Sequence, residues 1–497
     1  MSAAVERGRA AIIGGGVIGG GWAARFALMG WEVALFDPDP EAPRKLAEVF
    51  ANARLALPGL ADAPLPPEGR VEIVPTISEA VHGADWIQES VPERLELKRK
   101  VYQQIQAHAP EAAVLASSTS GFKPSELQGC ATWPGQIIVA HPFNPVYLLP
   151  LVELVTTDAN DPALVEKAKA VLASIGMHPL HLRREIDAHI ADRLLEAVWR
   201  EALWLIKDGI ATTAEIDDAI RMGFGLRWAQ MGLFETYRIA GGEAGMRHFL
   251  AQFGPALEWP WTKLMDVPEL DEALVEAIAS QSDAQSGAHS IRELERIRDT
   301  NLVTILRGLK ARGWGAGEVL ARHDAALSEA SSLPRRFDDL VDLARPIRSL
   351  ERVVPADWAE ADGRMSEERY SHVLGDATRR VLQIIASDCE HTPGGSFVTA
   401  EIRIRHLGQA QAGDRLHVET LVNSGEGAQL RLFHALFAGE RLIATAEHAL
   451  SHLGGETPAP TPPPETLAAR IAALVAAHAS LLRGGAASLP AETTGEG

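Results

Sequence analysis

The sequence predicts three folded parts: a doubly wound, parallel α/β unit, an all-α unit and a smaller α+β unit. Short apolar strands alternate with helical periodicity over residues 1–186. The period becomes helical almost throughout residues 187–322. A polar segment of mixed charge, 323–345, is interpreted as a linker, and one helical run then precedes several alternating runs within residues 346–453.

Residues 10–37 carry the strongest local signal. Three glycines, Gly14, Gly16 and Gly19, directly follow a short apolar strand in the spacing Gly-x-Gly-x-x-Gly. Such glycines permit a tight turn, close approach of a pyrophosphate and close packing of helix on strand. The helix that begins at Val17 and Ile18 offers unpaired N–H groups to the anion. The pattern therefore predicts a dinucleotide-binding βαβ unit.

The acidic residue after the second strand indicates which dinucleotide is bound. That strand ends in Asp37, whose carboxylate can accept hydrogen bonds from the adenosine ribose hydroxyls. The same charge repels the additional phosphate of NADP, and the next basic residue is Arg44. We therefore expect the cofactor to be NAD.

Composition excludes several classes of partner. The chain has 46% apolar and 23% charged residues and a net charge of −19, without a basic block suited to nucleic acid. It contains no signal-peptide core and no apolar stretch of about 18 residues, so no membrane span is expected. Only two cysteines occur, which predicts a reducing, cytoplasmic location; no metal site is expected.

Polar residues at the ends of the predicted strands suggest the chemistry. Ligands of open parallel sheets bind beyond the carboxyl ends of the strands. One strand runs into Ser120, another ends at His141, and a third carries Glu153. A histidine held by a carboxylate is a suitable base for removing the proton of an alcohol. His141 is thus predicted to be the base, with Glu153 orienting it and Ser120 holding the substrate oxygen.

Periodicity predicts the helices and strands of the remaining parts. In the all-α part, two helices are expected, one over Ile291–Leu309 and a buried one with an apolar face of Leu194, Leu195, Val198, Leu203 and Leu205. In the third part, a helix over Glu367–Ala386 precedes strands at Phe397–Leu407, Arg415–Val422, Gln429–Phe437 and Leu442–Leu450. Residues 454–497 are expected to form a Pro-rich spacer, an amphipathic helix from Leu467 to Leu482 and a disordered tail.

Residues from about 8 to 320 resemble the 3-hydroxyacyl-CoA dehydrogenase family. The resemblance rests on the glycine motif, Ala84–Glu93, Glu96-Leu97-Lys98, Ser118-Thr119-Ser120 and His141-Pro142-Phe143-Asn144-Pro145. It implies that Ser120 is the substrate serine and that His141 and Glu153 form the catalytic pair. It also implies that the nicotinamide half of the cofactor contacts Glu93, Lys98 and Asn144.

One position departs from that family and suggests a cationic substrate. Asp192 stands where the family has an active-site asparagine, and the segment 40–72 is poor in the lysines expected for binding CoA. A carboxylate and aromatic faces are suited to a quaternary ammonium group. The segment Asp187–Arg193 and an aromatic-rich stretch resemble the branch of the family that oxidises carnitine. Candidate substrate-binding residues are Asp192, Arg193, Phe224, Trp228, Phe234 and Tyr237, with Trp259 and Trp261 nearby in sequence.

Residues from about 346 to 453 resemble hotdog-fold acyl-CoA thioesterases. The family pattern Trp-x-Asp-x-Asn-Gly-His-Met, then Tyr, aligns with Trp358–Met365 and Tyr370. In this chain Glu360, Asp362 and Arg364 occupy the acidic, amide and histidine places of that pattern. The resemblance implies that Glu360 is the catalytic carboxylate and Asp362 the second choice. A domain that only mediates dimerisation is the alternative.

Together these features predict a cytoplasmic, NAD-dependent enzyme that oxidises the 3-hydroxyl of L-carnitine to 3-dehydrocarnitine, fused to a thioesterase that hydrolyses betainyl-CoA to glycine betaine. A homodimer is expected, because both halves resemble dimer-forming families. The first alternative is a 3-hydroxyacyl-CoA dehydrogenase with an acyl-CoA thioesterase, which a basic CoA-binding patch would favour. The second is a non-catalytic, crystallin-like nucleotide-binding protein, against which Ser120, His141 and Glu153 argue.

Overall fold

A computed structural model describes residues 7–240, 245–253, 262–263, 269, 271–360, 362–389, 395–454 and 459–483. The chain divides into two compact units, one of Met1–Ala53 and Pro67–His323 and one of Arg54–Pro66 and Asp324–Gly497. Trp259, Trp261 and the expected disordered tail lie outside the described residues.

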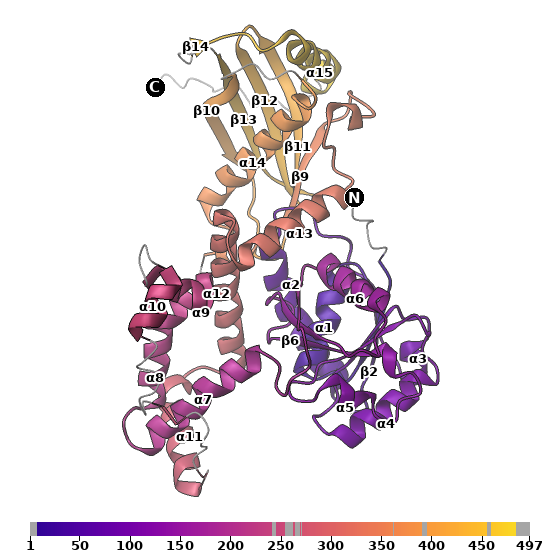
Figure 1. Cartoon of the computed structure of the whole chain (residues 1–497). Helices are drawn as coiled ribbons and strands as arrows, with labels where there is room; N and C mark the ends of the chain where they lie inside the picture. Colours follow the sequence, from indigo (N-terminus) through magenta and orange to yellow (C-terminus); the bar gives the residue numbers. More distant parts are fainter. Residues whose placement is uncertain are drawn as a thin grey trace. The chain divides into compact units, whose positions relative to one another are not determined.

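The first unit is built on an eight-stranded sheet in the order β3-β2-β1-β4-β5-β6-β7-β8 (Figure 1). The strands from β3 to β6 are parallel, as predicted, but β7 is antiparallel to β6, and β8 is parallel to β7. The expectation of a wholly parallel sheet is therefore wrong at one edge. The strands are β1 (Arg9–Ile13), β2 (Glu32–Phe36), β3 (Val71–Ile73), β4 (Trp86–Glu89), β5 (Val114–Ser117), β6 (Ile137–Pro142), β7 (Leu151–Val155) and β8 (His178–His181).

Helices surround this sheet and bury its apolar strands (Figure 1). The central strands are fully buried because both of their faces are covered, which explains their continuous apolar runs. Each large apolar side chain buried in this way contributes about 1.5–3 kcal/mol. The helices are α1 (Val17–Leu28), α2 (Ala42–Ala56), α3 (Ile77–Val81), α4 (Leu95–Gln106), α5 (Pro124–Gln128) and α6 (Pro162–Ser174), with short 3-10 turns η1 (Leu57–Leu60) and η2 (Pro134–Gln136).

The remainder of the first unit is helical, as predicted. Local signals set several ends: Thr212 and Ser290 cap α8 and α12 in capping boxes, and Gly313 ends α12 in the left-handed conformation. The elements are α7 (Ala191–Lys207), α8 (Thr213–Ala219), a π-helical turn η3 (Ile220–Phe224), α9 (Gly225–Ala240), α10 (Gly245–Phe253), α11 (Glu272–Ser286), α12 (Ile291–Arg312) and α13 (Ala316–Ala330). The last of these extends into the segment expected to be a linker.

The prediction that the helix containing Leu194 is buried is wrong for the isolated chain. Leu194 and Leu195 are each 58% exposed, and Leu203 is the buried residue of α7. The pattern correctly identifies an apolar helix face, but no element among the described residues covers Leu194 and Leu195. An exposed apolar face of this extent is typical of a contact surface for another molecule.

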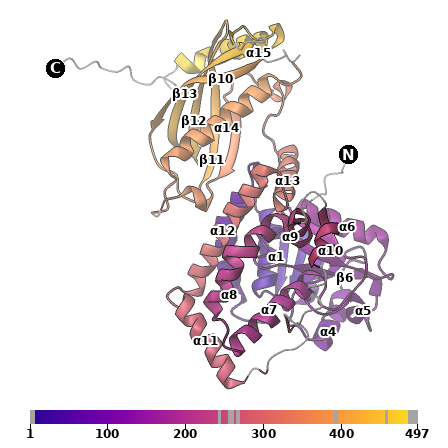
Figure 2. The same ribbon diagram turned by 60° about the vertical axis from the view of Figure 1, so that its left-hand side comes forward.

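The second unit folds as the predicted hotdog, a long helix lying across an antiparallel sheet (Figure 2). The sheet has the order β10-β13-β12-β11-β9, and β9 was not predicted from the sequence. The apolar side of α14 (Glu367–Ile385) packs on the sheet through residues such as Val373, Ala377 and Val381. The other elements are β9 (Ile347–Val353), β10 (Ser396–His406), β11 (Arg415–Glu426), β12 (Gln429–Ala438), β13 (Arg441–Gly454), β14 (Ala459–Pro460), α15 (Glu465–Arg483) and the 3-10 turns η6 (Phe337–Asp339) and η7 (Ala356–Trp358).

Helix α15 is long and apolar enough, by composition, to cross a membrane, with a mean hydropathy of 1.3 over Glu465–Leu482. The expectation that the chain contains no such stretch is therefore wrong by this measure. In the structure, Leu467, Ile471 and Leu474 are buried in the hotdog core. Arg470 donates to carbonyl groups at the end of α14, Ile385 O and Ser387 O. The apolar stripe of α15 thus serves the core of this unit.

The second unit also contains a segment that lies far from it in sequence. Residues 54–66 contain the last residues of α2 and the turn η1, and they belong to the second unit rather than to the dinucleotide-binding unit. The buried Arg352 of β9 binds Asp62 of this segment at 2.6 Å and Asp376 of α14 at 3.1 Å. This insertion could not be assigned from periodicity, because an ion pair with a residue some 290 positions away leaves no local pattern.

A buried chain of hydroxyl and imidazole groups lies beneath α14. Thr378 Oγ1 lies 2.9 Å from His434 Nε2 and 2.7 Å from His448 Nδ1, and Thr420 Oγ1 lies 2.9 Å from His434 Nδ1. Burial lowers the pKa of His448 to about 4, and burial together with the neighbouring His448 lowers the pKa of His434 well below its usual range. Both rings are consequently neutral in the folded protein near pH 7.

These two histidines should make the second unit sensitive to acid. In the unfolded chain a histidine takes up a proton near pH 6.5, so the unfolded state binds more protons and stability falls as the pH decreases from about 6.5 to about 4. His448 alone should account for a loss of about 3 kcal/mol. Urea unfolding of the full chain over this pH range measures the effect. His448→Asn, which keeps a polar atom near Thr378 but does not titrate, should lose less stability, and an equal loss contradicts the assignment.

Candidate active site

The antiparallel pairing of β6 with β7 places His141 directly opposite Glu153. His141 Nδ1 lies 3.1 Å from Glu153 Oε2, and the two side chains are 6% and 0% exposed. A carboxylate can only accept, so Nδ1 carries the hydrogen and Nε2 is left as the basic nitrogen. The structure therefore brings together the predicted base and its orienting carboxylate.

The second oxygen of Glu153 fixes the start of α7. Glu153 Oε1 accepts hydrogen bonds of 2.9 Å from the backbone N–H groups of Ile190 and Ala191. Burial by itself would raise the pKa of Glu153, but the hydrogen bonds from His141 and from these two N–H groups lower it overall. Glu153 is thus an ionised carboxylate that joins the histidine to the first turn of a helix.

Asp192, in that same turn, faces the other side of the histidine ring. Its Oδ2 lies 3.6 Å from His141 Nε2, and its side chain is 17% exposed. A carboxylate oxygen and a ring nitrogen without hydrogen are both acceptors, so they do not bond to each other, and both can accept from a donor that approaches beside them. His141 consequently stands between two carboxylates, one holding its Nδ1 and one close to its reactive nitrogen.

The remaining residues implied at the substrate lie in neighbouring loops. Ser120 is exposed in the loop after β5, and Asn144 is exposed in the loop after β6. Both loops leave the carboxyl ends of parallel strands, where the predicted site is expected. Arg193 is exposed and donates to Asp187 O at 3.4 Å. Its side chain therefore interacts with the loop before α7 in this structure.

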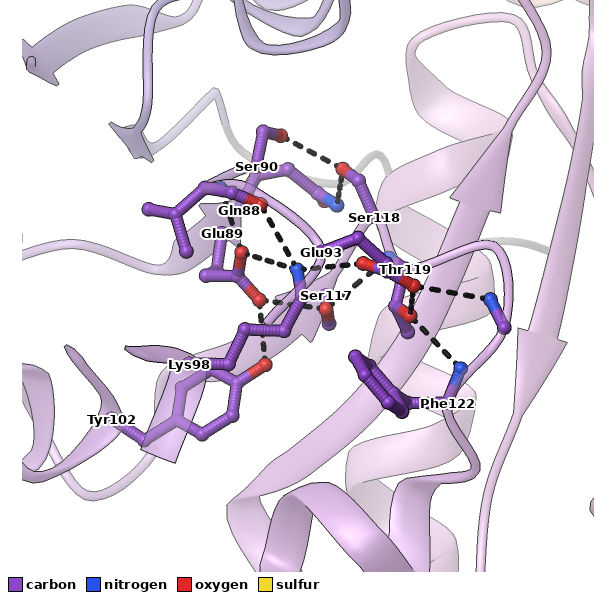
Figure 3. A network of polar contacts seen from close by, with 12 residues as sticks. Gln88, Glu89, Ser90, Glu93, Lys98, Tyr102, Ser117, Ser118, Thr119 and Phe122 are labelled. Atoms are coloured by element: carbon purple, nitrogen blue, oxygen red, sulfur yellow. Dashed lines mark hydrogen bonds and ion pairs between the residues drawn. The ribbon is translucent and has the colours of Figure 1, made fainter. Parts of the chain in front are cut away.

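A buried polar network supports the loops on the cofactor side (Figure 3). The carboxylate of Glu89, 0% exposed, accepts from Lys98 Nζ at 2.8 Å, Tyr102 OH at 2.6 Å and Ser117 Oγ at 2.7 Å. The Val91 N–H donates to the same carboxylate at 2.7 Å. These hydrogen bonds to Glu89 compensate for the free energy needed to remove the Glu89–Lys98 ion pair from water. Lys98 is therefore held in one position, in keeping with its implied role near the nicotinamide.

Glu93 lies at the open edge of this network. It accepts hydrogen bonds from Thr119 Oγ1 and from Gly121 N–H, and its Oε2 lies 3.3 Å from Lys98 Nζ (Figure 3). Burial would raise the pKa of Glu93, but the Thr119 hydroxyl and the Lys98 charge lower it overall. The structure thus brings Glu93 and Lys98 together, as the family resemblance implies.

The glycine loop after β1 has the form of a dinucleotide cradle. Gly14 has φ +100°, and a Cβ on Gly19 would lie 1.8 Å from the Gly14 carbonyl oxygen, so both positions require glycine. A Cβ on Gly16 would meet nothing within 4 Å, which leaves open space in front of the loop. Val17, 59% exposed, and Ile18 begin α1 at this point. Asp37, which follows β2, accepts from Gly15 N–H at 2.5 Å, so the carboxylate expected to bind the ribose lies against the glycine loop. These residues fit NAD.

The four predicted aromatic residues do not meet in one place. Phe224 and Trp228 touch, with ring centroids 4.5 Å apart, whereas Tyr237 stacks on Phe249 and Phe234 is 72% exposed. The reason is a break in α9 at Gly232, whose φ of 70° and ψ of −165° are not helical. Within one chain, the structure therefore contains no cage made of all four rings.

In the second unit, the predicted carboxylates lie in the turn before α14. Glu360 is exposed, and its backbone N–H donates to Arg364 O at 2.8 Å. Asp362 binds the Arg364 guanidinium at 2.5 Å, and hydrogen bonds from Arg364 lower the pKa of its carboxyl. Ser366 N–H donates to Trp358 O at 2.9 Å, which folds this turn against the first turn of the helix. Glu360 is the carboxylate of the two that is not bound to Arg364.

Sequence reasoning missed two buried residues of the first unit. Glu89 lies within the family motif Ala84–Glu93, but nothing in the sequence indicates that it is the centre of a buried network. His189, fully buried, has its ring centroid 5.4 Å from that of His141. A lone histidine before a helix carries no periodic signal. Its importance follows only from the close approach of the two chain segments.

Three family models match the chain. The 3-hydroxyacyl-CoA dehydrogenase NAD-binding domain matches residues 9–186, the C-terminal domain of the same enzymes matches residues 189–281, and the thioesterase-like superfamily matches residues 354–471. These matches confirm the predicted folds, the NAD cofactor and the combination of an oxidoreductase with a thioesterase-like domain.

Similar proteins cover nearly the whole chain. An L-carnitine dehydrogenase/betainyl-CoA thioesterase of Ruegeria pomeroyi is 61% identical over 475 residues, covering 95% of this chain and 96% of the relative. A protein of the same name from Agrobacterium fabrum is 56% identical over 448 residues, covering 89% and 90%. Among solved structures, an NAD+-dependent dismutase, 5-formyl-3-hydroxy-2-methylpyridine 4-carboxylic acid 5-dehydrogenase, is 26% identical with a TM-score of 0.52, covering 61% of this chain and 99% of that one.

Proposed function

Since this chain belongs to the family of L-carnitine dehydrogenase/betainyl-CoA thioesterases, we propose that it oxidises the 3-hydroxyl of L-carnitine to 3-dehydrocarnitine and hydrolyses betainyl-CoA to glycine betaine and CoA. The observation that supports the first activity best is His141, held by Glu153 on one side and facing Asp192 on the other, in the same sheet as the dinucleotide cradle. The second activity rests on the carboxylates before α14.

In the dehydrogenase, His141 Nε2 takes the hydroxyl proton of the substrate as its C3–H bond breaks. NAD, when bound, accepts the hydride from that carbon. The buried Glu153 carboxylate stabilises the imidazolium that forms, and it keeps the ring in the basic tautomer beforehand. Ser120 is our candidate to position the alcohol oxygen, and Glu93, Lys98 and Asn144 are our candidates to hold the nicotinamide half.

Asp192 is our candidate for recognising the substrate cation. In carnitine the trimethylammonium group is joined to the reacting carbinol carbon through a single methylene. The substrate carboxylate is equally close to that carbon, but a carboxylate 3.6 Å from the catalytic nitrogen attracts the cationic arm and repels the anionic one when the hydroxyl contacts His141. Arg193 remains a candidate for the substrate carboxylate. Phe224, Trp228, Phe234 and Tyr237 remain candidates for contact with the methyl groups, although the four rings are not assembled within one chain.

The activity test is an initial-rate assay of NADH formation with L-carnitine, D-carnitine and 3-hydroxybutyryl-CoA, each with NAD and NADP. We expect turnover with L-carnitine and NAD only, because Asp37 disfavours the phosphate of NADP and Asp192 favours a cation. Turnover with the CoA ester in place of L-carnitine would overturn the proposal.

Two variants in the same assay separate the roles of the groups at the site. His141→Ala should lower kcat roughly 100-fold or more, with NAD binding retained. Asp192→Asn should lower kcat/KM for L-carnitine by roughly 10- to 100-fold, while narrowing the preference for L-carnitine over 3-hydroxybutyrate, which lacks the cation. An unchanged preference would mean that Asp192 acts only through His141.

In the thioesterase, Glu360 is our candidate for attack on the thioester carbonyl carbon or for activation of a water molecule that attacks it. In either case the C–S bond breaks and CoA leaves as the thiolate. The N-terminus of α14, against which the turn is folded, can polarise the carbonyl oxygen. Asp362 is the second candidate.

Release of free thiol from betainyl-CoA measures this activity directly. Glu360→Gln should reduce the rate roughly 100-fold or more, because the amide is neither a nucleophile nor a base. The L-carnitine dehydrogenase rate of the same preparation serves as the control for folding. If Asp362→Asn abolishes thiol release and Glu360→Gln does not, the roles of the two carboxylates are reversed; absence of hydrolysis by the unaltered protein would overturn the proposal.

We also propose that the enzyme is a homodimer in the cytoplasm. The long strand β10 forms one edge of the hotdog sheet, and its Val398 and Ile402 are each 40% exposed. Such an edge invites pairing with a second strand. Cys130 and Cys389 are free, which suits a reducing compartment. Light scattering after gel filtration should give the mass of two chains. Ile402→Lys should reduce it to that of one chain if β10 is the interface.

A further inference from the structure

His189 has a buried nitrogen for which the described residues provide no partner. The side chain is 0% exposed, and its Nε2 lies 3.2 Å from the Thr119 carbonyl oxygen. Its Nδ1 is also buried, and no hydrogen-bonding atom of the described residues reaches it. An orphaned polar atom of this kind destabilises the protein unless a partner satisfies it. A position next to His141, with ring centroids 5.4 Å apart, places this atom at the candidate active site.

The existing contact defines which kind of partner is missing. A carbonyl oxygen only accepts, so Nε2 of His189 carries the hydrogen. Burial lowers the pKa of His189, which keeps the ring neutral near pH 7. Nδ1 is therefore a bare acceptor, and it requires an N–H or O–H donor.

The backbone at His189 adopts a conformation that is unfavourable for residues other than glycine. Ala188 and His189 have φ of 57° and 52°, the left-handed region that non-glycine residues rarely occupy. Ala188 N–H donates to Gly121 O at 3.3 Å, and the N–H groups of Ile190 and Ala191 bind Glu153. Strained residues fixed by their surroundings occur preferentially at functional sites. The position of the His189 ring is thus fixed by hydrogen bonds from its neighbours to Gly121 on one side and to Glu153 on the other.

The possible donors can be distinguished by their chemistry. L-Carnitine has one donor, its hydroxyl, and in the proposed function that proton goes to His141. The trimethylammonium and carboxylate groups have none. The nicotinamide ring, by contrast, bears a carboxamide with two N–H donors. His189 is bonded to Thr119, whose hydroxyl binds Glu93, and Glu93 is a candidate to contact the same half of the cofactor.

We propose that His189 is a cofactor-binding residue whose Nδ1 accepts a hydrogen bond from the carboxamide N–H of the nicotinamide. The inference rests on the proposed function only in assigning the substrate hydroxyl to His141. It adds to that function that the segment directly before α7 recognises the carboxamide of the cofactor.

Two amide variants separate this role from a structural one. His189→Gln can keep a donor near the Nε2 position for Thr119 but loses the acceptor at Nδ1. His189→Asn keeps an acceptor near Nδ1, and asparagine tolerates the left-handed backbone, but it loses the bond to Thr119. Calorimetric titration with NAD, without substrate, should show affinity reduced about 10-fold in the Gln variant and nearly retained in the Asn variant. The reverse order would show a structural role and overturn the proposal, as would unchanged affinity in both.

A cofactor analogue identifies the donor. In 3-acetylpyridine adenine dinucleotide a methyl ketone replaces the carboxamide, so the N–H groups are absent. The loss caused by His189→Gln should appear with NAD and disappear with the analogue, whereas an equal loss with both would point to a ribose hydroxyl and overturn the assignment. His189→Phe, which keeps a ring without nitrogens, gives the same comparison if the Gln variant does not fold. Because no substrate is present, these results are independent of whether L-carnitine is oxidised.

Discussion

The candidate active site depends on the buried carboxylate of Glu153. One of its oxygens holds His141 in the basic tautomer, and the other binds the N–H groups of Ile190 and Ala191 at the start of α7. The pairing of β6 with β7 brings His141 to the first oxygen. Asp192 and His189 lie close to His141 because α7 begins at this carboxylate. Glu153 thus assembles the site in addition to orienting a base.

Much of the fold follows from the sequence because its signals are local. The glycine spacing, the acidic end of β2 and the capping boxes involve residues near one another in the chain. Strand direction is different: alternation and apolar runs are the same for parallel and antiparallel strands, so the reversal at β7 could not be predicted. The burial of α7 was misjudged for a related reason, since an apolar stripe indicates a contact face without identifying what covers it.

The site residues likewise divide into those with a local signal in the sequence and those without one. The pairs His141 with Glu153 and Glu93 with Lys98 lie together in the structure, and both could be proposed from the sequence: the first stands in strands that the pattern predicts, and the second in a family motif. His189 and the central role of Glu89 depend on segments separated by many residues, and no spacing encodes them. The four candidate rings of residues 224–237 are not assembled within one chain, and the non-helical conformation of Gly232, which separates them, could not be predicted from an aromatic-rich stretch.

Segment 188–192 concentrates the features that distinguish this site. Its backbone begins in the left-handed conformation, continues into two N–H groups bound to Glu153, and presents one imidazole and one carboxylate toward His141. The two side chains require different partners. The neutral acceptor, His189 Nδ1, requires an N–H or O–H donor, whereas the anionic side chain of Asp192 attracts a cation. In the proposed function the hydroxyl proton of L-carnitine goes to His141, so the substrate meets only the second requirement. Under the two proposals above, a single turn therefore selects both the substrate and the cofactor of one reaction.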